Sequence, residues 1–486
     1  MTLFLARYRR TILAMRKLVL LLSFGLVTSA FAQTYDLVIE GGRVMDPESG
    51  LDATRTVGIT NGKIAQISAD PLKGVRVLQA KGLVVAPGFV DLHQHGQDVD
   101  SGRVKAFDGV TTALEMEIGV PDVAAYLARK KGRSLVNYGT SASHVAARAL
   151  IFGAPLPEGS ILPQAGPATD QPATDEQVQK IEERLRHELD AGGLGVGMGI
   201  EYTPGASHEE VIRMFRVAAE YGVPVFTHVR GGNLVDPHSG IESVEEVIGA
   251  AAVTGAALHI VHINSMCARQ SPECLALVAG ARARGLDVTT EAYPYGAAMT
   301  YINSAAFNPG WKEAQGLDYS DLALPDSGER LTKKRFEALH ASAQPQLVLE
   351  YLNSDATVDA IMTNPLVMVA SDGIPGHPRN AGTYSRILAR YVRDTRTITL
   401  MDAIRKMSLM PAQRMEKASQ DARRKGRLQV GADADIVAFD PNTVADHATY
   451  RHPMEPSTGM QFVIVNGTVL IDRGALVPNM FPGRPF

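Results

Sequence analysis

Hydrophobic residues in the middle of the chain fall in short runs that alternate with amphipathic segments. Eight runs read as buried strands, at residues 89–92, 112–117, 136–141, 193–197, 223–227, 257–261, 288–292 and 366–370. Segments of helical period lie between them, for example 175–191 and 209–221. Alternating strands and helices form parallel βα units, and eight such units predict an α/β fold with a (β/α)8 barrel of the TIM type. A doubly wound sheet is the alternative, but no glycine-rich phosphate loop opens the first helix.

Strand patterns of a different kind occupy both ends of the chain. They lie at residues 35–42, 57–67, 434–440 and 462–470, and Asn61-Gly62 and Asn466-Gly467 are typical of tight hairpin turns. We expect one small β-sandwich domain from residues 33–86 and 425–486, beside a barrel of residues 87–424. Two separate β appendages are the alternative. A stretch at 296–346, rich in turn signals, follows the seventh strand and is expected to form a lid.

The composition is that of an ordinary globular protein. The 486 residues are 45% hydrophobic and 21% charged, enough for a large core. A net charge of −4 gives no reason to expect a nucleic-acid partner. Cys267 and Cys274 form no CxxC motif, so a cysteine-rich metal site is not expected, and the sequence leaves open whether the two pair.

The first 32 residues have the pattern of a secretory signal peptide. Basic residues precede the apolar run 18–27, and small residues then end in Ala30-Phe31-Ala32. The mature chain is therefore expected to start near Gln33, in the periplasm or secreted, with no stable membrane partner after cleavage. An uncleaved membrane anchor is the alternative.

Polar side chains with metal-binding chemistry close several of the predicted strands. The first strand ends in His93 and His95, whose i, i+2 spacing places both imidazoles on one face. Glu115 and Glu117 close the second strand, and further strand ends carry His228, His262 and Asp372. Carboxyl ends of barrel strands meet at one face of the barrel. Their joint position predicts a site for a divalent transition metal such as zinc.

These residues resemble the amidohydrolase superfamily, in the order His-x-His, His, His, Asp on strands one, five, six and eight. The finer resemblance is to the D-aminoacylase (N-acyl-D-amino-acid deacylase) group, and it spans residues 35–483. It rests on Gly-Val-Thr-Thr at 109–112, Ile-Glu-Tyr-Thr-Pro-Gly at 200–205, Ala-Tyr-Pro-Tyr at 292–295, Ser-Asp-Gly at 371–373, His-Pro-Arg-Asn-Ala-Gly-Thr at 377–383, and Gly-Ala-Asp-Ala-Asp-Ile-Val at 431–437.

The resemblance implies metal-dependent hydrolysis of the amide bond of small N-acyl-D-amino acids. One or two zinc ions, or another divalent metal, are expected in two positions: one held by His93, His95 and Asp372, the other by Glu117, His228 and His262. Asp372 is the expected catalytic acid–base. Arg379 is the candidate for the substrate carboxylate because its planar fork suits bidentate pairing. Tyr295 and His377 are further substrate-binding candidates.

Two positions depart from the group's pattern. The group places a metal-binding cysteine in an Asn-Cys-Gly after strand two, where this chain has Glu117-Ile118-Gly119, and strand four has no lysine to be carboxylated. A carboxylate must take that role, and Glu117, nearer the strand end, is preferred to Glu115. Asn264 stands where the group often has lysine, which affects the expected substrate. A dipeptidase or another amide hydrolase is the nearest alternative, and a non-catalytic binding protein on the same barrel is a further one.

Overall fold

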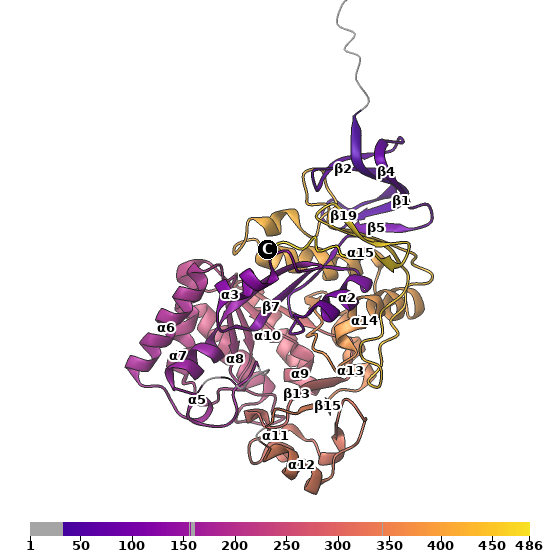
Figure 1. The fold of residues 1–486 in the computed structure, drawn as a ribbon. Helices are drawn as coiled ribbons and strands as arrows, with labels where there is room; N and C mark the ends of the chain where they lie inside the picture. Colours follow the sequence, from indigo (N-terminus) through magenta and orange to yellow (C-terminus); the bar gives the residue numbers. More distant parts are fainter. Residues whose placement is uncertain (1–32, 155, 157–160, 343) are drawn as a thin grey trace, which may run out of the picture.

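Eight parallel strands form the centre of the molecule (Figure 1). The computed structural model describes residues 33–154, 156, 161–342 and 344–486. The strands pair in the order β16-β12-β11-β10-β9-β8-β7-β6, which confirms the predicted barrel. Their bounds are β6 (Phe89–Asp91), β7 (Val110–Val120), β8 (Asn137–Ser143), β9 (Val196–Gly199), β10 (Val225–His228), β11 (Leu258–Ile260), β12 (Val288–Ala292) and β16 (Val367–Val369).

A buried polar cluster links the first and last strands of this barrel. The Asp91 carboxylate at the end of β6 accepts hydrogen bonds from Lys105 Nζ at 2.9 Å and from the backbone N–H of Ser371 at 3.0 Å. Gln94 and Gly373 form a parallel bridge just beyond. Asp91, Lys105 and Ser371 are fully buried, so each depends on the others for its hydrogen-bond and charge partners. The cluster brings together the strand ends that precede the first histidines and Asp372.

Helices pack around the strands, and their sequences show why they form. In α7 (His208–Tyr221), Val211, Met214, Phe215 and Ala218 are buried at helical spacing, and the Ser207 hydroxyl caps the N-terminus. The helix α6 (Asp175–Asp190) also matches its predicted segment. The other helices are α2 (Val99–Phe107), α3 (Val123–Lys130), α4 (His144–Ile151), α5 (Pro167–Asp170), α8 (Gly240–Thr254), α9 (Ile263–Cys267), α10 (Ser271–Ala283), α13 (Asp355–Thr363), α14 (Arg379–Arg386), α15 (Leu400–Ile404) and α16 (Met410–Met415).

Strands from both ends of the chain join in one nine-stranded sheet, at the top of Figure 1. Strand β5 pairs with β17, so the N-terminal and C-terminal parts share a ladder. Leu37, Val57, Ile436 and Ile464 lie in one buried cluster between them. Both Asn-Gly pairs form two-residue hairpin turns with positive φ at each residue. The strands are β1 (Thr34–Asp46), β2 (Leu51–Thr60), β3 (Lys63–Ser68), β4 (Lys73–Gln79), β5 (Val84–Pro87), β17 (Ile436–Phe439), β18 (Met460–Val465), β19 (Thr468–Asp472) and β20 (Ala475–Leu476).

A separate insertion follows β12, where a lid was predicted. It contains a small antiparallel sheet of β13 (Ala297–Tyr301), β15 (Leu347–Tyr351) and β14 (Leu322–Ala323), with the helices α11 (Trp311–Gln315) and α12 (Lys333–His340). Phe307, Trp311 and Phe336 pack their rings together, so the insertion has a core of its own. Figure 1 shows it at the end of the molecule farthest from the nine-stranded sheet.

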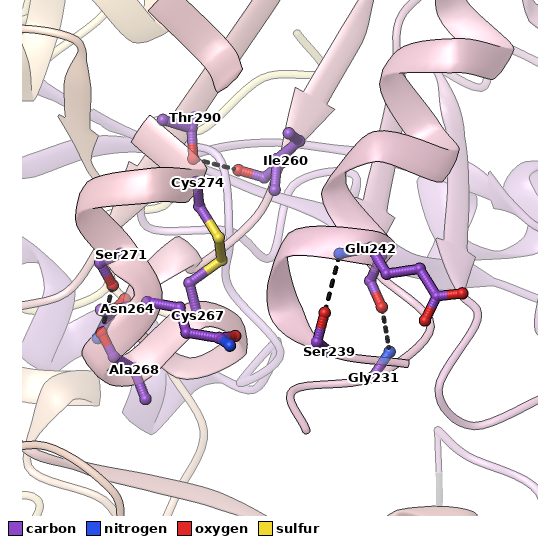
Figure 2. The surroundings of a disulfide bond; sticks show 12 residues. Gly231, Ser239, Glu242, Ile260, Asn264, Cys267, Ala268, Ser271, Cys274 and Thr290 are labelled. Carbon is purple, nitrogen blue, oxygen red and sulfur yellow. Dashed lines mark hydrogen bonds between the residues drawn. A yellow bond between two sulfur atoms is a disulfide. The ribbon is translucent and has the colours of Figure 1, made fainter. Parts of the chain in front are cut away.

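A disulfide joins Cys267, the last residue of α9, to Cys274 in α10. Figure 2 shows the bond next to Ser271, whose hydroxyl donates to the carbonyl of Ala268 at 2.6 Å. Both cysteines are buried. The sequence left this pairing open, and the disulfide fixes the turn between two helices that follow β11.

The predicted signal peptide, residues 1–32, lies outside the described residues. Within the described part of the chain, no helix has both the length and the apolar character needed to cross a membrane.

Candidate metal centre

The six predicted metal-binding residues come together at the carboxyl ends of the barrel strands. Their ligand atoms form two groups in which all atoms lie within 4.8 Å of one another. The first group is His93, His95, Glu117 and Asp372, and the second is Glu117, His228 and His262. All but His95 are buried. Because Glu117 belongs to both groups, the two positions share one carboxylate.

Each oxygen of Glu117 faces a different group of imidazoles. Oε2 lies 3.1 Å from His93 Nε2 and 3.0 Å from His95 Nε2. Oε1 lies 2.8 Å from His228 Nδ1 and 2.7 Å from His262 Nε2. A carboxylate placed in this way can bind one ion through each oxygen, as a bridge between two metal positions.

Glu115 points inward from the same strand but lies behind the histidines. Its Oε2 is 2.7 Å from Nδ1 of His95, and its Oε1 accepts the backbone N–H groups of Ile118 and Gly119 at 3.3 and 3.4 Å. Strand alternation alone left both glutamates as candidates. The geometry favours Glu117 as the ligand and gives Glu115 the task of orienting His95.

Two more carboxylates orient histidines, and the sequence did not single them out. Glu291 in β12 lies 2.7 Å from His93 Nδ1, and Glu201 after β9 lies 2.7 Å from His228 Nε2. A carboxylate that accepts the N–H of one ring nitrogen fixes the tautomer and turns the lone pair of the other nitrogen to the centre. Glu291 also contacts His259 Nε2 at 3.0 Å, so its carboxylate holds two histidines.

The electrostatics of the cluster favour a positive charge at its centre. Burial lowers the pKa of His93, but the charges of Asp372 and Glu117 outweigh it and raise the pKa to about 10. Burial likewise acts against the His228 cation, while hydrogen bonds to Glu117 and Glu201 raise its pKa to about 9. A divalent cation meets the same electrostatic demand. Imidazole nitrogens and carboxylate oxygens are donors that suit zinc and similar metals.

The backbone is strained at two of the predicted ligands. His262 has φ 25° and Asp372 has φ 48°, in a region that residues other than glycine rarely adopt. Such strain is concentrated at functional sites, where the surrounding structure holds it in place.

The three predicted substrate-binding residues lie on the far side of Asp372. Arg379 is 1% exposed, its Nη2 lies 2.8 Å from Asp372 Oδ2, and its guanidinium lies over the Tyr293 ring at 4.6 Å. His377 bonds to backbone through both ring nitrogens, to the Ala297 carbonyl and the Arg379 N–H. It therefore supports the loop that carries Arg379. Tyr295 packs edge-on against His377, with its hydroxyl buried and unpaired among the described residues.

A cavity of about 240 Å³ opens next to the cluster. Its floor includes five of the six predicted metal residues, His95, Glu117, His228, His262 and Asp372. The apolar part of the wall comes from the barrel loops and the insertion, with Ile118, Leu162, Leu234, Met266, Met299 and Leu347. Its polar wall residues include Glu201, Tyr202, Arg269, Thr300 and Glu350. A small molecule with both apolar and polar groups can therefore reach the cluster.

The two strand-two glutamates can be distinguished by metal binding. We expect Glu117→Ala to lose metal from the purified protein, because both positions lose a carboxylate oxygen. Glu115→Gln should keep the metal but bind it about 10- to 100-fold more weakly, the usual effect of losing a group that orients a ligand. The measurement is metal content together with chelator competition. Glu183→Gln, on the exposed face of α6, is the control. Wild-type affinity in Glu117→Ala would contradict the assignment.

Comparisons with known proteins agree with this geometry. The model of the amidohydrolase family matches residues 162–471. The N-acyl-D-glutamate deacylase of Alcaligenes xylosoxydans xylosoxydans is 32% identical over 490 aligned positions, covering 92% of this chain and 96% of that protein. The D-aminoacylase of the same organism is 28% identical, with 90% and 94% covered. One similar solved structure is that of N-acyl-D-glutamate deacylase from Bordetella bronchiseptica, complexed with zinc and a phosphonate inhibitor. Its sequence is 26% identical, its TM-score is 0.76, and the match covers 93% of this chain and 99% of that one. The chain therefore belongs to the amidohydrolase family.

Proposed function

We propose that this protein is a metal-dependent hydrolase of N-acyl-D-amino acids, releasing a carboxylic acid and a D-amino acid. The observation that carries the proposal is the Glu117-centred cluster beside Asp372, open to a cavity of small-molecule size. The similarity to deacylases extends over nearly the whole length of both chains. The D-preference is taken from those relatives.

Zinc is the proposed metal, in one or two ions. The similar Bordetella deacylase was crystallised with zinc, and the donor set of imidazoles and carboxylates here suits zinc. A bound divalent ion supplies a water of lowered pKa and polarises the amide carbonyl. The carboxylates of Glu115, Glu201 and Glu291 contribute by fixing the imidazoles before the substrate arrives.

Asp372 is the proposed general base and acid. Its side chain lines the cavity, with Oδ1 3.4 Å from His93 Nε2 and 3.3 Å from His95 Nε2. Burial raises the pKa of Asp372, but the neighbouring positive charges of Arg379 and His93 hold it well below its usual range. The carboxylate is therefore ionised and can accept the proton of the attacking water. It can then return that proton to the leaving amine.

Arg379 is the proposed partner of the substrate carboxylate. One of its terminal nitrogens is paired with Asp372, while Nε and Nη1 have no hydrogen-bond partner among the described residues. Buried donors of this kind are seldom left unpaired. The ring of Tyr293 holds the guanidinium plane in position. A substrate carboxylate bound here would be adjacent to the catalytic aspartate.

The proposal has two competitors, and one assay separates them. A dipeptidase would release amino acids from dipeptides but not from acetylated ones. A non-catalytic binding protein would hold metal without hydrolysing any amide. Amine release from paired N-acyl-D-, N-acyl-L- and dipeptide substrates, measured with metal content, tests all three. Turnover confined to substrates that release an L-amino acid, dipeptides included, would contradict the deacylase proposal.

Substitutions of Asp372 and Arg379 should lower activity in different ways on different substrates. Asp372→Asn should lower kcat at least about 10²-fold on every substrate, because an amide cannot accept the proton. Arg379→Lys keeps a positive charge beside Asp372 but loses the planar fork. Its kcat/KM should fall about tenfold or more on substrates with a free carboxylate, the scale of one charged hydrogen bond.

The control is the same substrate with its carboxylate amidated. The Arg379→Lys penalty should largely disappear on it, and the Asp372→Asn penalty should remain. Metal content must be measured in both variants, because Asp372 also lies in the cluster. Equal Arg379→Lys penalties on the charged and amidated substrates would show that Arg379 does not bind the carboxylate.

We also propose that the protein is exported to the periplasm or secreted. The basic and apolar pattern of residues 1–32 supports this proposal. The Cys267–Cys274 disulfide gives independent support, because such bonds form and persist mainly in oxidising compartments. Mass spectrometry of the protein from its native cells should find a mature N-terminus near Gln33. A full-length chain retained in the cytoplasm would contradict export.

A further inference from the structure

A buried carboxylate in the insertion faces the cavity without a partner. Glu350 lies in β15, opposite Ala298 of β13, and Ala298, Thr300 and Glu350 all line the cavity beside the cluster. Glu350 is only 7% exposed. Among the described residues, its carboxyl group makes no hydrogen bond or ion pair. Burying such a group unpaired is unfavourable, so its position needs an explanation.

Charges of both signs lie near Glu350, but no cation is bound to its carboxyl group among the described residues. Burial raises the pKa of Glu350 to about 8, the charge of Glu201, another cavity residue, adds to the shift, and the positive charges of His228 and Arg379 act against it. Of these cationic groups, Arg379 is held by Asp372 at 2.8 Å, and His228 lies between Glu117 and Glu201. Arg269 lines the cavity but is exposed and forms no ion pair with Glu350. The internal residues outside the described ranges, 155, 157–160 and 343, include no lysine or arginine.

The backbone around Glu350 is rigid enough to present the carboxylate in one place. β15 is the central strand of its sheet and pairs with β13 on one side and β14 on the other, and Glu350 is paired on both sides. The neighbouring Thr300 hydroxyl donates to Tyr202 Oη at 3.1 Å, which ties the insertion to the barrel loop after β9. A carboxyl group fixed in this way can discriminate between substrates, because no loop has to move to bring it into the cavity and a cation bound beside it would favour its ionised form.

We propose that Glu350 binds a cationic group of the substrate, so that the preferred substrates carry a primary ammonium group. This inference rests on the proposed deacylase function and names its substrate class. The ammonium can belong to the side chain of the D-amino acid or to the acyl group, as in an aminoacyl-D-amino acid. Substrates with an acidic side chain should be poor, because two carboxylates would meet in a buried site. The expected preference for a cationic substrate is thus opposite to the acidic substrate after which the 32% identical N-acyl-D-glutamate deacylase is named.

Four substrates that differ in the charge of the side chain or of the acyl group test the proposal. N-acetyl-D-lysine and N-acetyl-D-norleucine differ by a side-chain ammonium, and glycyl-D-norleucine differs from N-acetyl-D-norleucine by an ammonium on the acyl group. N-acetyl-D-glutamate is the acidic member. The zinc-loaded wild-type enzyme should prefer one ammonium substrate over N-acetyl-D-norleucine at least about tenfold in kcat/KM. If N-acetyl-D-lysine is preferred, the side chain faces Glu350; if glycyl-D-norleucine is preferred, the acyl group does.

The variant Glu350→Gln keeps the size of the side chain and removes its charge. It should lose at least about tenfold in kcat/KM on the preferred ammonium substrate, while N-acetyl-D-norleucine changes by less than about threefold. Glu313→Gln, an exposed carboxylate of the same insertion, is the matched control and should leave every ratio unchanged. A neutral Glu350 that only fills the cavity wall predicts no change in the ratios.

Two results would overturn the proposal. One is that the wild-type enzyme has equal kcat/KM for the ammonium and the neutral substrate in both the side-chain and the acyl-group comparison. The other is that Glu350→Gln loses kcat/KM equally on ammonium and neutral substrates. If no N-acyl-D-amino acid is hydrolysed, the deacylase function itself fails. Glu350 is then tested by calorimetric binding of the same compounds to zinc-loaded protein. Tighter binding of an ammonium compound, lost in Glu350→Gln, would still support the Glu350 site. Equal affinities would refute it.

Discussion

The carboxylate of Glu117 is the contact on which the site depends. It lies between four imidazoles that come from the ends of three different strands, and its two oxygens divide them into two groups. Four ring nitrogens, three of them from buried histidines, lie close together around this carboxylate, whose negative charge favours positive charge there. The barrel supplies the geometry, since β6, β7, β10 and β11 all end at the same face. The Asp91 cluster then joins β6 to the segment after β16, which places Asp372 beside His93.

A ring of further carboxylates gives the centre its rigidity. Glu291, Glu115 and Glu201 each accept from a ring nitrogen of one histidine, so three of the four imidazoles are oriented by the protein. A cysteine thiolate in place of Glu117 would add one soft ligand. Here the residue shared by the two groups is a hard oxygen donor, and the whole set consists of nitrogen and oxygen atoms. Such a set admits zinc and also other divalent metals, in keeping with the range expected from the residues.

Much of this site could be predicted because its residues occupy positions that sequence patterns mark. His93 and His95 close an apolar run, as do His228 and His262, and a barrel brings such ends together. The alternation of side chains along a strand could not decide between Glu115 and Glu117 as the metal ligand, because both point to the same face. Their positions along the twisted strand decide which one reaches the centre. Glu291 and Glu350 give no local signal. Each is one glutamate within a strand, and only tertiary packing shows what its carboxylate faces. His377 and Tyr295 lie in marked motifs, yet the structure places both behind Arg379, which itself reaches the cavity only through Asp372.

The most direct test of this account is to locate the metal by anomalous diffraction at the zinc absorption edge, from crystals grown with zinc. The account predicts anomalous peaks on the Glu117 side of the histidines, with a Glu117 oxygen about 2.0–2.2 Å from the ion. Peaks on both sides would identify the carboxylate as a bridge, and one peak would identify a single-ion centre. Zinc held by the histidines with Glu117 outside bonding distance, or zinc bound to Glu115 in its place, would contradict it.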